Sequence, residues 1–246
     1  MFDPALAAAV HRSSAGDTHR GHIHQTEILS DLFAGHFDAV ITAGEAFGQT
    51  LLGLGVAEAA DGEVVAFDGE VWRIPADGRP VIAEPNLGLP FAIAADGGEH
   101  LIEELPPGLG FDGITAHIDT TLGHRDRHHD HLVAAIRIDG TFGDVLMRSE
   151  PRQSRPFPLL STVLEHEAQF EFDTWTGTLV GFRFPDVNDG IVIPGLHLHG
   201  VSSDRTSGGH CHHATIVSAT MRIWVDDVDV RIPYPHIGDY LASSSS

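Results

Sequence analysis

Short runs of β-branched and aromatic residues, separated by turn-forming residues, recur along most of the chain, and this pattern constrains the fold more than any other feature. Two such runs flank Asp68-Gly69 and two more flank Asp139-Gly140, an arrangement typical of β-hairpins. Further strand-like runs with short turns occupy 170–184, 190–202, 214–225 and 228–235. We therefore expect an α+β fold with mixed, mostly antiparallel β-sheets and a few helices.

Helical patterns are confined to the front of the chain. The apolar residues within 28–33 follow helical spacing, and Gly35 is suited to end that helix. Thr42 is followed three residues later by Glu45, which is the pattern of a capping box. We therefore predict one helix before Gly35 and a second that starts at Thr42.

The three histidines in the stretch 194–210, PGLHLHGVSSDRTSGGH, form the clearest candidate site. In a strand, His197 and His199 point to the same face, about 6.6 Å apart along the chain. The polar, Gly-rich loop after them lets the chain turn back and bring His210 alongside. Three imidazoles suit a transition metal and leave room for water or substrate, as catalytic zinc sites require. The spacing predicts a metal site with these three ligands.

Chance is the competing explanation, because 18 histidines make such a pair easy to obtain. We interpret the His-rich stretch 124–131 as a solvated loop, and we place no ligand at His22 or His24. In a strand, at most one of His212 and His213 faces the same way as the third ligand, and neither is assigned a role.

The Pro-rich stretch 150–160 is the best candidate for a crossing between two domains. A chain of 246 residues is long enough for one large domain or two small ones. We predict a loose N-terminal arm over 1–21, an N-terminal α/β domain over 22–150, and a C-terminal β-rich domain over 151–246 that carries the three histidines.

The charge is strongly acidic, with 35 acidic residues against 14 basic ones, all arginine, and a formal net charge of −21. A surface of this sign repels the phosphates of nucleic acids and anionic membranes, so we expect neither as a partner. A small anionic substrate would need strong local positive charge to enter such a field. The one cysteine, Cys211, cannot form a disulfide within the chain, and we find neither a signal peptide nor a membrane span. We therefore expect a cytoplasmic location.

The histidine stretch resembles the signature of the acetolactate decarboxylase family, and the order of the preceding blocks agrees. The stretch 47–74, with its Gly-rich segment and Asp-Gly-Glu, is similar to one block of that family. AAIRIDGTFGDVLMRSEPRQSRPFPLL, residues 134–160, resembles its central block, and 170–199 leads in register to the histidines. The resemblance covers roughly residues 23–233.

The resemblance implies a two-domain α/β fold built on β-sheets, a homodimer, and a carbon-carbon carboxy-lyase that converts 2-acetolactate to (R)-acetoin and CO2. It implies a divalent metal, usually zinc, held by His197, His199 and His210. It also places Glu63 at the metal and makes Arg148 face the active centre. Without the resemblance, a surface acid at the entry to a hairpin is the favoured interpretation of Glu63.

The implied reaction explains these residue types. Loss of CO2 leaves an electron pair that delocalises onto the neighbouring ketone as an enediolate, and a divalent ion stabilises that charge. Arg148 offers a planar fork for the substrate carboxylate or the developing oxyanion. Glu63, Arg148 or a water that they hold would deliver the proton stereospecifically. Alternatively, Arg148 is only a surface arginine or a partner of Glu150. In that case Arg152 or Arg155 would be the arginine that binds the substrate.

The chain departs from the family's pattern at several positions. The family commonly has a glutamate near its C-terminus that reaches back to the metal, whereas the last glutamate here is Glu171. Asp239, His236 or a water molecule would instead take the position of that glutamate, as an extra metal ligand or proton donor. Val56 stands where the family often has threonine. The missing glutamate keeps open a relative that binds metal or ligand without catalysis. A second alternative is a cupin-like metal enzyme acting on another small 2-hydroxy-3-oxo acid, because two histidines one residue apart with a later histidine also occur on cupin barrels.

Overall fold

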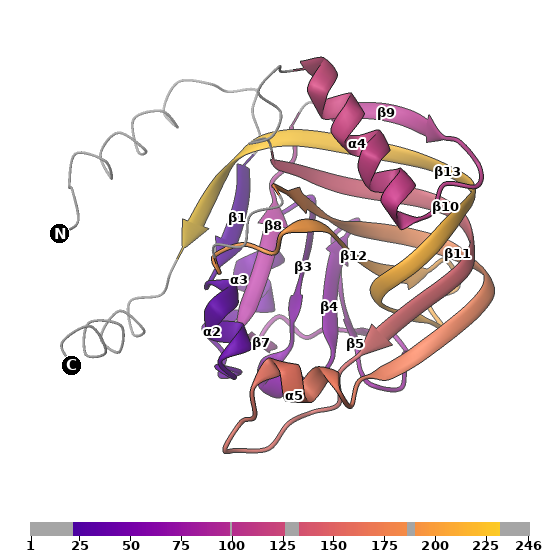
Figure 1. Cartoon of the computed structure of the whole chain (residues 1–246). Helices are drawn as coiled ribbons and strands as arrows, with labels where there is room; N and C mark the ends of the chain where they lie inside the picture. The colour runs from indigo at the N-terminus through magenta and orange to yellow at the C-terminus, as the bar shows by residue number, and fades with distance from the viewer. Residues whose placement is uncertain (1–21, 99, 126–132, 186–189, 232–246) are drawn as a thin grey trace, which may run out of the picture.

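The computed structural model describes residues 22–98, 100–125, 133–185 and 190–231 (Figure 1). The strands are β1 (His22–Thr26), β2 (Ile41–Thr42), β3 (Leu52–Val56), β4 (Glu63–Phe67), β5 (Glu70–Ile74), β6 (Val81–Ile82), β7 (Gly88–Leu89), β8 (Phe91–Ala95), β9 (His100–Leu105), β10 (Val133–Ser149), β11 (Ala168–Phe184), β12 (Gly195–Ser202) and β13 (Gly208–Arg231). The helices are α2 (Leu29–Phe33), α3 (Ala43–Phe47), the 3-10 helix η1 (Glu58–Ala60), α4 (Phe111–Arg125) and α5 (Leu160–Leu164). The predicted α+β class is confirmed. The predicted arm over 1–21, most of the His-rich stretch 124–131, and His236 and Asp239 lie outside the described residues.

One hydrogen-bonded sheet of eleven strands runs through the molecule in the order β10-β11-β12-β13-β1-β8-β3-β4-β5-β6, with β9 paired to β13. Strand β10 pairs with both β11 and β13, so β10 to β13 close into a ring, seen as curled strands on the right of Figure 1. The described pairings are antiparallel except for that of β1 with β13. The domain boundary at residue 150 stays a prediction; β10 lies before it and pairs with β11 and β13, which lie after it.

The two predicted hairpins have different outcomes. Asp68 and Gly69 have φ values of 54° and 78° and join β4 to β5, as their pattern predicts. The prediction at Asp139-Gly140 is wrong, because β10 runs through both residues without turning. Each edge of β10 is occupied there, by β11 on one side and β13 on the other, and Gly140 lets Ser218 and Ala219 of β13 approach closely. The strands predicted at 214–225 and 228–235 likewise belong, as far as residue 231, to the single strand β13.

The helices at the front of the chain form as predicted, and a longer one follows. Helix α2 ends before Gly35, which has a φ of 85°, and the Thr42 side chain caps α3 in a capping box with Glu45. Helix α4 has 15 residues and was not predicted; it packs Ile114 and Ile118 against the ring of strands. It also takes in the start of the His-rich stretch, where we expected a loop, since it ends at Arg125.

The alternation of residues along β4 decides which face of the strand meets the site. Val64 and Ala66 pack in one cluster with α3, whereas Val65 and Phe67 pack in another with β11 and β12. Because side chains alternate along a strand, Glu63 shares the face of Val65 and Phe67. Glu63 is therefore directed toward β12, which carries two of the histidines.

Candidate metal centre

The hairpin formed by β12 and β13 brings the three histidines together, as the sequence predicts. His197 and His199 leave one face of β12, while Leu198 between them is buried in the core on the other face. His199 is directly paired with His210 on β13. Asp204 shapes the connecting loop, because its Oδ1 accepts hydrogen bonds from the Ser202 hydroxyl at 2.7 Å and the Thr206 N–H at 3.1 Å.

The ring nitrogens of these histidines converge. One nitrogen from each ring lies within 4.8 Å of the other two, and the Nε2 atoms of His197 and His199 are 3.1 Å apart. Nδ1 of His210 is buried and has no hydrogen-bond partner among the described residues. A buried nitrogen in this position needs a partner, and a metal ion supplies one.

The environment keeps the imidazoles neutral, which is the form that binds metal. Nδ1 of His199 donates to the Val64 carbonyl oxygen at 2.9 Å, so its Nε2 carries the free lone pair. Burial lowers the pKa of His199 to about 4 and the pKa values of His197 and His210 well below the usual value. The donor set therefore fits a divalent transition metal.

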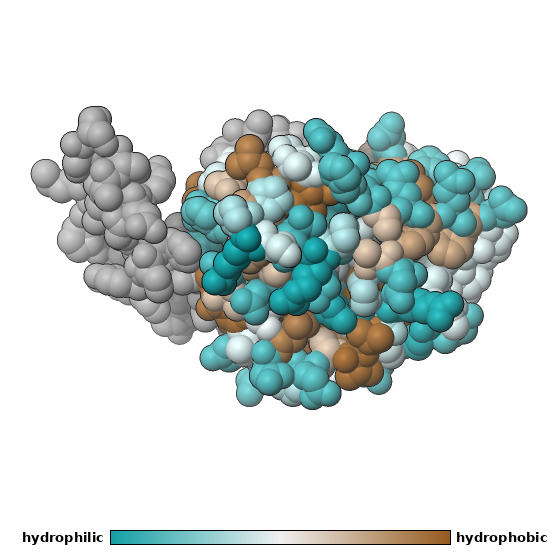
Figure 2. Space-filling view, turned by 90° about the horizontal axis from the view of Figure 1, so that it is seen from below, coloured by the Kyte–Doolittle hydropathy of each residue, from teal (hydrophilic) through white to brown (hydrophobic). Residues whose placement is uncertain are grey.

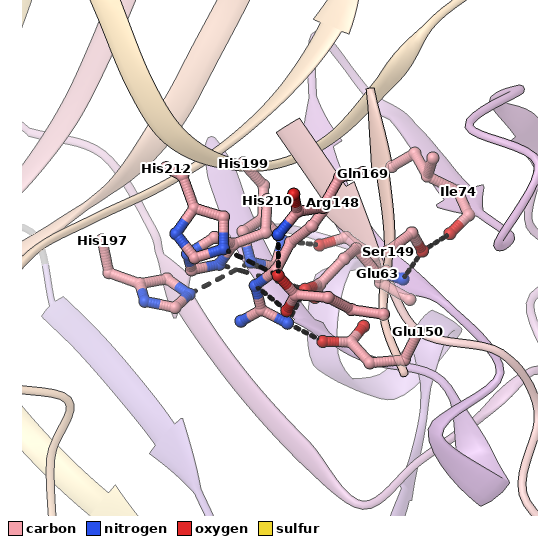
Figure 3. A network of polar contacts seen from close by, with 12 residues as sticks. Glu63, Ile74, Arg148, Ser149, Glu150, Gln169, His197, His199, His210 and His212 are labelled. Atoms are coloured by element: carbon pink, nitrogen blue, oxygen red, sulfur yellow. Dashed lines mark hydrogen bonds and ion pairs between the residues drawn. The ribbon is translucent and has the colours of Figure 1, made fainter. Parts of the chain in front are cut away.

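Glu63 lies beside the three rings. Its Oε2 is 3.4 Å from Nε2 of His199, and its Oε1 is 3.9 Å from Nδ1 of His210. Its main-chain N–H donates to the Ser149 hydroxyl at 3.4 Å, and that hydroxyl donates to the Ile74 carbonyl oxygen at 2.6 Å, which ties β4 to the end of β10 (Figure 3). Burial raises the pKa of Glu63 to about 7 although nearby Arg148 opposes the shift. Glu63 is thus a buried site residue and not a surface acid.

Arg148 points into the same group from β10, where it pairs with His210 of β13. Its Nη1 is 3.6 Å from Oε1 of Glu63 and contacts Glu150 more closely, and its Nε is 3.3 Å from Oε2 of Glu167. Burial lowers the pKa of Arg148, but these three carboxylates outweigh burial and raise it. Arg148 therefore pairs with Glu150, which we considered as an alternative, and also lies in the site.

These groups form one end of a cavity of about 290 Å³. Its polar wall consists of Glu63, Arg148, Glu150 and the three histidines. Its apolar wall comes from β3, α2, α5 and the segment before β12, and includes Leu54, Val56, Leu32, Leu160 and Ile193. On the face seen in Figure 2, on the side of the molecule where α5 lies, apolar side chains reach the surface in patches among polar ones. The cavity therefore suits a small molecule with both charged and apolar parts.

Three site residues received no role from the sequence. Glu150 was considered only as a partner of Arg148, although the spacing of two residues along an extended chain puts both on one side. The same spacing from His210 places His212 against Glu167, with Nε2 and Oε1 3.5 Å apart. Glu167 itself carries no local signal, since only the pairing of β10 with β11 brings it to Arg148.

The other residues considered in the sequence lie outside this site. Arg152 and Arg155 form exposed ion pairs with Asp61 and Asp38, so neither takes the place of Arg148. His24 contacts Asp96 at 2.7 Å and belongs to no three-residue metal group among the described residues. Cys211 points into the core opposite the site, and burial raises the pKa of its thiol to about 12.

The fold and the site together define a class of protein: a mostly antiparallel α+β chain with three converging histidines suited to a metal ion. The family model for alpha-acetolactate decarboxylase matches residues 23–243, so the chain belongs to the acetolactate decarboxylase family. This assignment decides against the cupin-like alternative. None of the helices in the described part of the chain is both long and apolar enough to cross a membrane.

Individual relatives agree. The chain is 31% identical over 228 residues to the alpha-acetolactate decarboxylase of Methylococcus capsulatus, covering 91% of this chain and 84% of that one. It is 32% identical over 188 residues to that of Klebsiella aerogenes, covering 76% and 70%. The crystal structure of alpha-acetolactate decarboxylase from Bacillus subtilis strain 168 matches with a TM-score of 0.80 and 27% identity, covering 87% of this chain and 89% of that one.

Proposed function

We propose that the protein is a metal-dependent decarboxylase that converts 2-acetolactate to (R)-acetoin and CO2. One observation carries the proposal: in a chain of this family, three neutral histidines, a buried carboxyl group and a buried guanidinium share one small cavity. The roles of the individual residues follow from their contacts.

His197, His199 and His210 would hold the ion, for which we propose Zn²⁺. The bond from His199 to the Val64 carbonyl fixes one ring, and an outer hydrogen bond of this kind raises the basicity of the ligand. When bound, the ion supplies a Lewis acid that polarises the ketone oxygen of the substrate. Neutral ligands leave the ion its full charge for that purpose.

Arg148 would bind the substrate carboxylate or the developing oxyanion. A guanidinium presents a planar fork that matches two oxygen atoms, and it supplies the local positive charge that an anion needs against a net charge of −21. Glu63 contacts both Arg148 and two of the histidines, so it orients the guanidinium relative to the ligand set.

In the reaction, the bond between C2 and the carboxylate breaks and releases CO2. The electron pair moves onto the ketone oxygen and leaves an enediolate. The pair then returns to form a C–H bond at C2 with a proton from one face, which yields acetoin. The apolar wall of the cavity disfavours water on the face of the enediolate that it covers. Protonation from the opposite face is therefore favoured, which gives one enantiomer of acetoin.

We also propose a cytoplasmic homodimer with no nucleic-acid or membrane partner. The single cysteine fits a reducing compartment, and the charge of −21 disfavours polyanions. Exposed apolar side chains such as Ile102 on β9 and Val217 on β13 provide surface that a second copy would cover.

The direct test is to purify the protein, measure its metal content by mass spectrometry, and add racemic acetolactate. We expect CO2 and optically pure (R)-acetoin, loss of both on chelation, and recovery with a divalent ion. His199→Ala should abolish metal binding, whereas His213→Ala, on an exposed neighbour, should retain it. Bound metal without acetoin above the spontaneous rate would identify a binder without catalysis, and a folded protein that binds no metal would refute the assigned ligands.

A further inference from the structure

Glu150 is a buried carboxyl group in the cavity wall to which the reaction above assigns no step. Glu150 follows β10 directly in the chain and is only 3% exposed to solvent. The cavity is lined by Glu150 together with Arg148 and Glu63. Its side chain faces the guanidinium of Arg148 in Figure 3.

The two oxygens of Glu150 have different surroundings. Oε1 accepts a hydrogen bond from Nη1 of Arg148. Oε2 is buried, and no N–H or O–H group among the described residues donates to it. The carboxyl of Glu63 is close enough to interact with the Glu150 side chain. Two buried carboxyl groups in contact retain a proton between them, because two adjacent negative charges repel.

We propose that Glu150 is a further catalytic residue: the acid that delivers the proton to C2 after CO2 has left. This inference rests on the proposed function. The Glu150 O–H bond breaks, its electron pair stays on the carboxylate, and the enediolate pair forms the new C–H bond. The carboxylate then takes a proton from solvent, so each turnover consumes one proton, as the conversion of an anionic acid to neutral acetoin and CO2 requires.

The electrostatic surroundings support a protonated Glu150. Burial, with the charge of Glu63 adding to it, raises the pKa of Glu150 to about 8 against the opposing effect of Arg148. His199 on β12 and His212 on β13 also lie within reach of its charge. A carboxylic acid of this kind is protonated at neutral pH and can act as a general acid.

A purely structural role, as counter-ion of Arg148, is the competing explanation, and the chain provides a matched control for it. Glu167 also contacts Arg148, with Oε2 3.3 Å from Nε, and its side chain is 12% exposed against 4% for Glu150. It is held by Gln169, whose Nε2 donates to its Oε1 at 2.8 Å. Glu167 is absent from the cavity wall. Replacing each glutamate by glutamine therefore separates proton delivery from support of Arg148.

The experiment compares the wild type, Glu150→Gln and Glu167→Gln, each loaded with metal. It measures kcat and KM for acetolactate, the enantiomeric ratio of acetoin by chiral chromatography, metal content and the urea midpoint. For Glu150→Gln we expect kcat to fall about a hundredfold and the (R) excess to fall toward zero, because general acid catalysis contributes on this order. KM and metal content should stay near the wild-type values. For Glu167→Gln we expect a change mainly in KM, with the (R) excess retained.

The inference is overturned if Glu150→Gln keeps its kcat and its (R) excess, or if both variants only raise KM to a similar extent. If Glu150→Gln does not fold, Glu150→Asp decides instead. The shorter acid should lower kcat about tenfold, and a wild-type kcat would refute proton delivery by this side chain. A wild type that releases no CO2 from acetolactate would instead refute the proposed function, so the two failures are distinguishable.

Discussion

Gly181→Ala is predicted to damage the metal centre although Gly181 contacts no ligand atom of it. Gly181 lies on β11, where it pairs with Leu198, the residue between the two histidines of β12. A Cβ atom added at Gly181 would lie 1.8 Å from the carbonyl oxygen of His197 and 2.9 Å from Cα of Leu198. Both are backbone atoms, so no side-chain rotation can relieve the clash.

The size of the effect follows from these distances. An ordinary contact of a Cβ atom is 3.4–4 Å, so β11 and β12 would have to separate locally by roughly 1.6 Å. Overpacking of this kind costs about 3 kcal/mol of unfolding free energy. Because His197 moves with its own backbone, its ring leaves the position in which the three nitrogens converge. We expect metal affinity to fall by about tenfold to a hundredfold, the range found when the support of a ligand is removed.

The assay combines urea unfolding of the metal-free protein with a competition titration against a metal chelator. The matched control is Gly143→Ala on β10, where an added Cβ would meet its nearest neighbours at 3.6 Å. That variant should stay within about 0.5 kcal/mol of the wild type and bind metal normally. If Gly181→Ala matches the control in both stability and affinity, then the close approach of β11 to β12 does not position His197, and the reasoning fails.

Three further predictions concern charge and reactivity. In the metal-free protein, Glu150 has a pKa of about 8 against 4.5 in an unfolded chain. The folded state therefore retains a proton that the unfolded state loses, and the wild type should lose about 1.4 kcal/mol per pH unit relative to Glu150→Gln as the pH rises between these values. Urea unfolding from pH 4 to 9 measures this, and a pH-independent difference would contradict the raised pKa. Arg148→Met should lower kcat/KM about a hundredfold, because the site loses the buried positive charge that binds the substrate. It should also lower the urea midpoint, because three carboxyl groups lose their cation. Unchanged steady-state kinetics would place Arg148 outside the reaction. Cys211, buried and with a pKa raised to about 12, should not react with a thiol reagent until the protein is denatured, so rapid labelling of the native protein would show that its strand opens.

Local patterns in the sequence determine a large part of the site. The two-residue spacing of His197 and His199 places both on one face of a strand, and a polar loop returns His210 beside them. The same locality explains the correct turn at Asp68-Gly69. These features depend on a few neighbouring residues, so they could be predicted without knowledge of the tertiary fold. The blocks that resemble the acetolactate decarboxylases added Glu63 and Arg148 to the site.

Some local signals were misleading or were missed. Asp139-Gly140 has the composition of a hairpin turn, but strands on both sides of β10 keep the chain extended there. Helix α4 contains Gly113 and several threonines, which weaken its helical signal, although Phe111, Ile114 and Ile118 have helical spacing. In both segments, packing against other elements outweighs the local propensity.

The tertiary structure alone decided how the charges of the site are arranged. Glu63 comes from β4, Arg148 from β10 and Glu167 from the residue just before β11, and no pattern within any one strand shows that these three meet. Their pKa shifts likewise depend on burial and on neighbours far away in the sequence. Hydrogen bonding between strands sets that register, and it depends on the whole sheet rather than on any one segment. The sequence therefore predicted the three histidines that converge, whereas only the folded sheet decided which carboxyl groups surround the guanidinium and which of them face the cavity.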